Sequence, residues 1–192
     1  KIFLRDDIWR RITKIGFREA SHITRKLTIR WTEPLLLNLI ARRIVQNKSL
    51  TEHLRIDVDT TLSHYDDQSR VFYRLFPRQI DIGPRKPETL KWILGRVRDG
   101  FRKVAPRELI HLLNKSKEDQ IKRIEIGSHN LPDDQLFESA AIKNALEEVS
   151  RFHFEQTLLA EHTELRSNLL LLQIQKSDQL KDTLARIWSV NV

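Results

Sequence analysis

The sequence predicts a mainly α-helical protein, with two short strands confined to its first 31 residues. Three patterns predict this fold class. Apolar residues recur at helical spacing over most of the chain, prolines stand where helices begin, and apolar–polar alternation is found only near the N-terminus. A chain of 192 residues is long enough for one large domain or two small ones with a real core.

The first 31 residues alternate between strand and helix patterns. KIFL (1–4) is typical of a short buried strand, and residues 8–17 place apolar side chains on one helical stripe. ITRKLTIRW (23–31) alternates as a strand does over most of its length. This part of the chain is therefore predicted to be strand, helix, strand. The side chains that define the two longer patterns are Ile8, Trp9, Ile12 and Ile15 in the helix and Ile23, Leu27, Ile29 and Trp31 in the second strand.

The middle of the chain is predicted to be helical with two interruptions. Thr32 and Pro34 are typical of a helix start, and Pro106 favours another helix beginning there. The polar segment 48–69 predicts an irregular loop, and Gly and Pro residues predict a turn-rich connection near residue 83. The expected helices span 32–47, 68–76, 87–101 and 106–125, with the connection over 78–87.

The C-terminal part is predicted to be helical after a linker at 127–132. One or two helices are expected over 136–162 and a last helix over 177–188. Helical spacing predicts that the first of these buries one apolar stripe, made of Ile142, Leu146, Val149 and Phe152.

Composition excludes several classes of protein. With no cysteine, disulfides and thiolate metal sites are excluded. The longest apolar run, at 169–172, is far below the roughly 20 residues that cross a bilayer, and the first residues do not form a signal peptide. We therefore expect a soluble, cytoplasmic protein with no membrane partner. The absence of methionine indicates a fragment, or a sequence from which residues are missing.

Charge is unevenly distributed. Residues 1–115 hold 25 Lys and Arg against 13 Asp and Glu, a net charge of +12, whereas residues 116–192 have a net charge of −4. A basic surface attracts the phosphates of nucleotides or nucleic acids, although a solvated arginine-rich face has the same composition. The acidic C-terminal part argues against DNA binding through residues 130–192 and favours a protein contact there, with 169–172 in the interface or in the core.

Gly95 and Gly100 form a GxxxxG pattern that only partly resembles a phosphate-binding loop. A genuine loop continues Gly-Lys-Ser/Thr, because the lysine binds the phosphates and the hydroxyl binds Mg²⁺. Here Phe101 and Arg102 follow, and the segment before Gly95 has helical rather than strand character. The pattern is therefore not interpreted as a nucleotide cradle.

Three segments together resemble the C-terminal half of bacterial AAA+/STAND-type P-loop ATPases. They are KIFLRDDIW (1–9), LTIRW (27–31) and KPETLKWILGRVRDGFRKVAPRELIHLLN (86–114), and they occur in family order. The resemblance covers most of the chain, is strongest over 1–47 and 71–115, and is weak after residue 130. It implies a short βαβ remnant of the ATPase core at 1–31, a helical lid at 32–126, and a helical, winged-helix-like module at 127–192.

The resemblance also implies nucleotide-sensing residues. Arg107 matches the sensor-2 arginine that begins the lid helix, and a guanidinium is suited to phosphate because it binds oxygens bidentately. Arg5 and Asp6 would lie at the carboxyl end of the strand that carries sensor-1, where ligands of open α/β sheets bind. A first-turn surface arginine and a structural salt bridge of Arg5 are the structural alternatives.

The departures from the family concern catalysis. The 192 residues contain neither GxxxxGK[ST] nor an apolar strand ending in paired acids, so phosphates and Mg²⁺ would be bound only by a core that is missing from this sequence. We expect no ATP hydrolysis and no cofactor for this chain alone. The prediction is a lid and C-terminal portion of an ATPase that senses nucleotide within the full-length protein, with a protein partner or homo-oligomer possible. A free-standing helical adaptor or nucleic-acid-binding module is the alternative.

Other chemistry receives little support from the sequence. The seven histidines lie in no metal-ligand spacing, and His153 and His162 are interpreted as ordinary partners of nearby carboxylates. The four tryptophans are interpreted as core anchors rather than base-stacking platforms, because each has apolar neighbours at core spacing.

Overall fold

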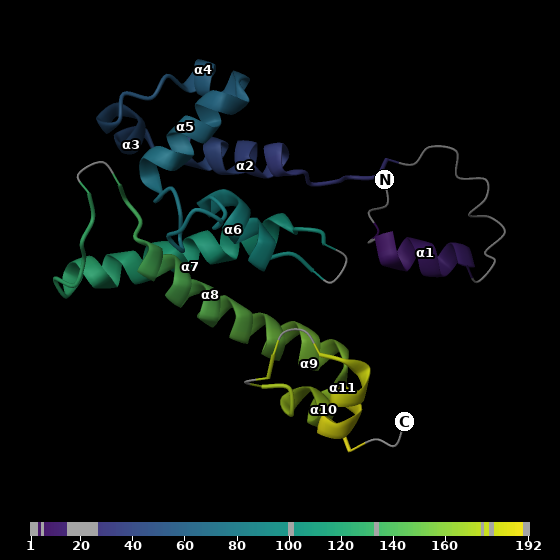
Figure 1. The fold of residues 1–192 in the computed structure, drawn as a ribbon. Coiled ribbons are helices and arrows are strands. Elements are labelled where there is room, and N and C mark those ends of the chain that lie inside the picture. Colours follow the sequence, from purple (N-terminus) through teal and green to yellow (C-terminus); the bar gives the residue numbers. More distant parts are fainter. Residues whose placement is uncertain are drawn as a thin grey trace.

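The computed structural model of the chain is built from helices and connecting turns (Figure 1). This confirms the predicted mainly α-helical class. The structure describes residues 4, 6–14, 27–99, 102–132, 135–173, 175–176 and 179–189. The helices of the described residues are α1 (Asp6–Lys14), α2 (Glu33–Val45), α3 (Lys48–His53), α4 (Val58–Ser63), α5 (Tyr65–Leu75), α6 (Thr89–Arg96), α7 (Pro106–Glu125), α8 (Ser139–His153), α9 (Leu159–Glu161), α10 (Arg166–Leu170) and α11 (Lys181–Ile187).

The predicted strands are not supported. Residues 27–31 have no regular secondary structure and pair with no strand in the described part of the chain. Leu27, Ile29 and Trp31, which the prediction placed on one face of the strand, are 89%, 66% and 41% exposed. A strand forms when a second strand pairs with it and a layer covers its apolar face, and the described residues supply neither. The strand predicted at 1–4 lies outside the described residues except for Leu4, which has no regular structure. The βαβ remnant is therefore without support.

The polar segment 48–69 is helical, which corrects the prediction of an irregular loop. It forms α3, α4 and the first turn of α5. Asn47 accepts a hydrogen bond from the backbone N–H of Leu50 at 3.1 Å, and Asp57 accepts one from the backbone N–H of Thr60 at 3.2 Å. These side chains satisfy N–H groups that have no partner within the helix, so short polar helices become stable here.

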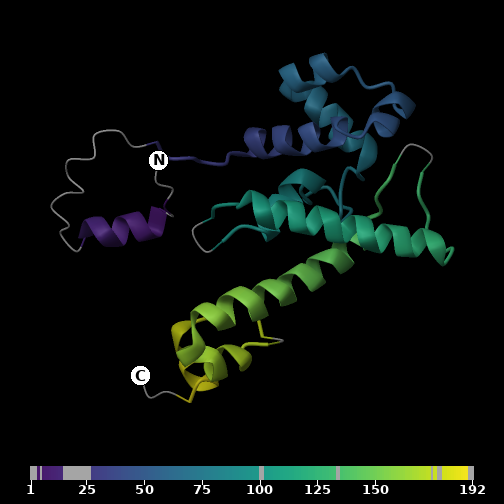
Figure 2. The ribbon, with the colours of Figure 1, turned by 180° about the vertical axis from the view of Figure 1, so that it is seen from behind.

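Five helices share one hydrophobic core. Leu37 of α2, Phe72 of α5, Ile93 of α6, Leu112 of α7 and Ile142 of α8 are all 0% exposed and belong to the same cluster. Viewed from both sides, α2 to α5 lie on one side of α6 and α7, and α8 extends away on the other (Figures 1 and 2). The core therefore spans residues on both sides of the linker at 127–132.

The two ends of the chain lie away from this core. In both views α1 is set apart from the other helices, and residues 27–32 lead from that side into α2 (Figures 1 and 2). At the other end, the far part of α8 carries α9, α10 and α11. The indole N–H of Trp188 donates to the backbone oxygen of Asn168 at 2.8 Å and so joins α11 to α10.

Trp92 and Trp31 have different environments. Trp92 is 3% exposed, and its indole N–H donates to Asp81 at 2.8 Å, as expected of a core anchor. Trp31 is 41% exposed, so the same expectation is wrong there. In the apolar run at 169–172, Leu170 and Leu171 are 40% and 53% exposed. No helix of the described residues is both long enough and apolar enough to span a bilayer.

Candidate functional site

Arg107 lies in the first turn of α7, as the proline before it predicts. Its side chain is 80% exposed, and its Nη2 and Nε donate to one oxygen of Glu108 at 3.0 and 3.2 Å. Glu108 is only 16% exposed, and its other oxygen lies 3.9 Å from His153 Nδ1 at the end of α8. Arg107 is thus an exposed cation that a more buried carboxylate holds on one side.

A basic turn precedes α7. Arg98 and Val104 form an antiparallel bridge, and the backbone N–H of Asp99 donates to Lys103 O at 2.8 Å. The Asp99 side chain also accepts from the backbone N–H of Lys103 at 2.8 Å. Arg98, Arg102 and Lys103 are exposed. We name Arg98, Arg102, Lys103 and Arg107 the basic turn.

The basic turn has the charge that an anion site needs. From residue 98 to residue 108 the sequence holds four Lys and Arg against two acids, Asp99 and Glu108, so positive charge is in excess along this segment. The backbone N–H groups in the first turn of a helix add partial positive charge at the same end. Ala105 provides no side-chain cap for these groups. The arrangement suits phosphate or another oxyanion.

The sequence also predicted Arg5 and Asp6 as nucleotide-binding residues, and no described contact places either of them beside the basic turn. Arg5 lies outside the described residues. Asp6 is the first residue of α1, and its side chain is not among those described. Their roles beside a nucleotide stay predictions.

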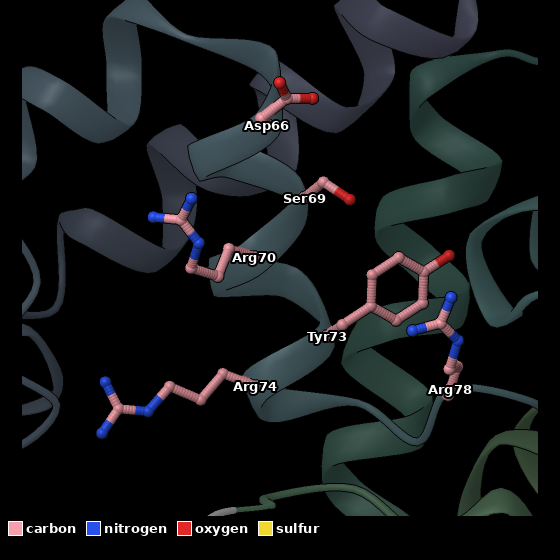
Figure 3. Close-up of a pocket in the computed structure, with 6 residues that line it drawn as sticks. All are labelled: Asp66, Ser69, Arg70, Tyr73, Arg74 and Arg78. Atoms are coloured by element: carbon pink, nitrogen blue, oxygen red, sulfur yellow. The ribbon is translucent and has the colours of Figure 1, made fainter.

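A shallow hollow of about 570 Å³ lies on α5 and the segment after it (Figure 3). It is lined by polar side chains, three of them arginines. Arg70 Nη1 donates to Asp67 at 2.6 Å, Arg78 Nη2 donates to Glu88 at 2.8 Å, and Arg74 Nη1 donates to the backbone oxygen of Leu54 at 2.5 Å. The lining residues are Asp66, Ser69, Arg70, Tyr73, Arg74 and Arg78.

Tyr73 is a hydrogen-bond donor in this hollow. Burial, together with the negative charge of Glu88, raises the pKa of Tyr73 to about 12. Its hydroxyl lies 3.4 Å from Glu88 Oε2 and donates to it. At neutral pH the phenol is therefore protonated and is unsuited to act as a general base.

The arginines of the hollow were not among the residues predicted from the sequence. Arg70, Arg74 and Arg78 follow one another at intervals of four, and this is the only signal that the sequence offered. Their partners Leu54 and Glu88 are distant in sequence, so only the fold shows that the guanidinium groups are held in place.

No metal centre is found in the described part of the chain. No group of three or more His, Asp or Glu side chains there is arranged to hold an ion. His162 Nδ1 lies 3.7 Å from Glu164, as expected of an ordinary exposed pair, whereas His153 faces Glu108 of α7. Gly95 belongs to α6, which agrees with rejecting a nucleotide cradle at GxxxxG, and Gly100 lies outside the described residues.

Comparisons with protein-family models, with curated proteins and with solved structures found no match to this chain. The resemblance to P-loop ATPases therefore rests on the sequence segments alone.

Proposed function

We propose that this chain supplies the helical lid and C-terminal module of a P-loop ATPase, with residues 1–31 joining them to the nucleotide-binding core. One observation carries the proposal. Arg107, the residue that matches sensor-2 of such ATPases, is 80% exposed in the first turn of a helix and is accompanied by three further cations of the basic turn. A lid arginine that meets nucleotide on closure needs this exposed position.

The geometry of Arg107 is compatible with phosphate binding. Glu108 occupies the Nε and Nη2 side of the guanidinium, so the Nη1 side remains for a ligand. A phosphate bound on the Nη1 side would leave the bond to Glu108 in place, because Glu108 is only 16% exposed and lies on the other side of the guanidinium. In the proposed reaction Arg107 would stabilise charge on the terminal phosphate and would take no proton.

ATP and Mg²⁺ would be bound mainly by the core. The sequence has no Walker A motif, and the described residues contain no group of three or more His, Asp or Glu side chains arranged to hold an ion. In this proposal the basic turn contacts one part of the nucleotide, namely its terminal phosphate. We therefore expect this chain alone to bind Mg·ATP weakly or not at all, which isothermal titration would measure.

The decisive experiment uses the full-length protein encoded by the reading frame that contains this sequence. Arg107→Ala should lower ATP turnover by about 100-fold, the lower end of the range found on removing a donor that stabilises transition-state charge. Arg107→Lys should restore part of the loss, because an ammonium keeps the charge and lacks the bidentate fork. Turnover is measured at saturating ATP, beside a thermal melt of each variant.

Lys117→Ala is the matched control, since Lys117 is an exposed cation on the same helix. It should leave turnover and melting unchanged. Turnover by Arg107→Ala equal to that of the wild type would overturn the proposal, as would an encoded protein that lacks a phosphate-binding loop. Either result would favour a helical adaptor that never binds nucleotide.

A further inference from the structure

The hollow on α5 belongs to a second basic surface, separate in sequence from the basic turn. Arg70 and Arg78 are 77% and 83% exposed, and Arg74 is also exposed. In Figure 3, Arg70 and Arg74 extend to the same side of α5, one turn apart, and Arg78 lies beside Tyr73. One turn of an α-helix rises about 5.4 Å, so two of these guanidinium groups can contact successive charges of a polymer.

Each guanidinium is oriented by one of its nitrogens. The partners are Asp67 for Arg70, the backbone oxygen of Leu54 for Arg74, and Glu88 for Arg78. In every case the bond uses a single terminal nitrogen, and an arginine offers five N–H donors in all. The remaining donors are available to a ligand, and the orienting bonds lower the side-chain entropy that binding would cost.

Basic residues next to the hollow create an excess of positive charge. Within the hollow itself, Asp66 offsets part of the charge of the arginines. Asp67, which pairs with Arg70, and Glu88, which pairs with Arg78, offset more of it. Arg55 is next in sequence to Leu54, whose backbone oxygen binds Arg74. A second hollow of about 690 Å³ shares Arg78 with the first, and Arg85 and Lys86 are next in sequence to Pro84, which lines it. We name the resulting set the arginine surface: Arg55, Arg70, Arg74, Arg78, Arg85 and Lys86.

An apolar side chain stands beside these cations. Ile82, which lines the second hollow, is 93% exposed. The loop that carries it is held by Gln79, whose amide Nε2 donates to the backbone oxygens of Gly83 at 3.1 Å and Lys86 at 2.8 Å. An isoleucine held in this way next to arginines offers a contact for a base, while the arginines contact phosphates.

We propose that the arginine surface binds the phosphodiester backbone of a nucleic acid, with Ile82 contacting a base. Guanidinium groups bind phosphate oxygens bidentately, and Arg70 and Arg74, one helical turn apart on the same side of α5 (Figure 3), match a polymer with one charge per repeat. The hydroxyl of Ser69, on the wall of the first hollow, adds a neutral donor. The proposal is independent of the proposed ATPase role, because it uses none of the residues of the basic turn.

The test is fluorescence anisotropy of the 192-residue chain with labelled single-stranded DNA, single-stranded RNA and duplex DNA, titrated at several salt concentrations. The triple variant Arg70→Gln/Arg74→Gln/Arg78→Gln should bind at least about tenfold more weakly. The fall of log K with log salt should also become shallower, by about 0.7 to 0.9 in slope for each phosphate contact that is lost. Ile82→Ser should weaken binding to single strands without changing that slope. The three probes show which form of nucleic acid is bound.

The matched control is Arg151→Gln/Arg166→Gln/Arg186→Gln, which removes the same charge from three exposed arginines of the C-terminal helices. It should bind almost as the wild type does. If circular dichroism shows that the first triple variant is unfolded, Arg70→Gln/Arg78→Gln, which keeps the contact between Arg74 and Leu54, replaces it.

Three results would overturn the proposal. They are no binding of any probe by the wild type, equal weakening in the control, and displacement of the probe by poly-glutamate as effectively as by unlabelled nucleic acid. The last result would show a surface for acidic protein segments instead.

Discussion

Phe72 and Phe152 show how differently two aromatic residues on helices can be placed. Phe72 is 0% exposed and stacks on Phe76 at a centroid distance of 4.4 Å. Phe152 is 53% exposed and makes an edge contact with His111. We expect Phe72→Ala to lower the free energy of unfolding by about 3–5 kcal/mol, because it leaves a cavity in the core. Phe152→Ala, the control, should cost under about 1 kcal/mol. Urea denaturation of both variants measures this, and equal costs would contradict the core described here.

The sequence predicted Phe152 on the inward stripe, and this prediction is wrong. Ile142 and Val149, from the same predicted stripe, are 0% and 5% exposed, as expected of core residues. Phe152 lies near the C-terminal end of α8, outside the buried core cluster, and makes its edge contact with His111 of α7. Helical spacing predicts which residues share a face, but it does not predict how far along the helix another element covers that face.

At the scale of elements, Glu138 joins two helices and the linker between them. It precedes α8, accepts from Arg123 of α7 at 2.7 Å, and accepts from the backbone N–H of Asn130 at 2.5 Å. Its own backbone N–H donates to Gln120 of α7 at 2.8 Å. Burial raises the pKa of Glu138, but hydrogen bonds led by that from Arg123 outweigh burial and hold this pKa below its ordinary value.

This depressed pKa predicts how stability changes with pH. A carboxyl with a lower pKa in the folded state stabilises the fold above its unfolded pKa, and the contribution is lost as pH falls through the folded pKa. Glu138→Gln should therefore cost about 1–3 kcal/mol at pH 7, and the difference from wild type should shrink below about pH 4. Thermal melts over this pH range measure it. Glu147→Gln, on the exposed face of α8, is the control and should be nearly neutral. A pH-independent difference would mean that the charge of Glu138 is not what stabilises the fold.

At the scale of the whole molecule, local sequence signals predicted where several helices lie. They did not predict the contacts that join segments far apart in the sequence. Pro106 predicted the start of α7, and the prediction is confirmed, because proline acts on its own turn. The strand over 23–31 also rested on a local pattern, but a strand needs a partner that the pattern cannot name. For the candidate sites, the sequence predicted where Arg107 lies in its helix. It could not predict that Leu54 orients Arg74 of α5 or that Glu88 orients Arg78 in the segment after it, since these contacts join separate segments.

The arrangement of the molecule predicts where a protease cuts first. Residues 27–32 are exposed and have no regular secondary structure, whereas the buried core lies within residues 36–159. We expect trypsin to cut the bond after Arg30 earlier than any site from α2 to α8. A protease binds its substrate in an extended conformation, which residues 27–32 can adopt without unfolding a helix. Mass spectrometry of brief digests identifies the product that begins at Trp31.

That product should keep the melting temperature of the intact chain, because none of the described residues among those removed belongs to the core cluster. Of the helices in the described part of the chain, this product lacks α1, so its helical circular dichroism should fall by at least that share. The same product tests the boundary predicted at 31/32, since a separate N-terminal part can be removed without loss of the remaining fold. Early cuts within α5, or a product that melts well below the intact chain, would instead mean that residues 1–30 stabilise the helical core.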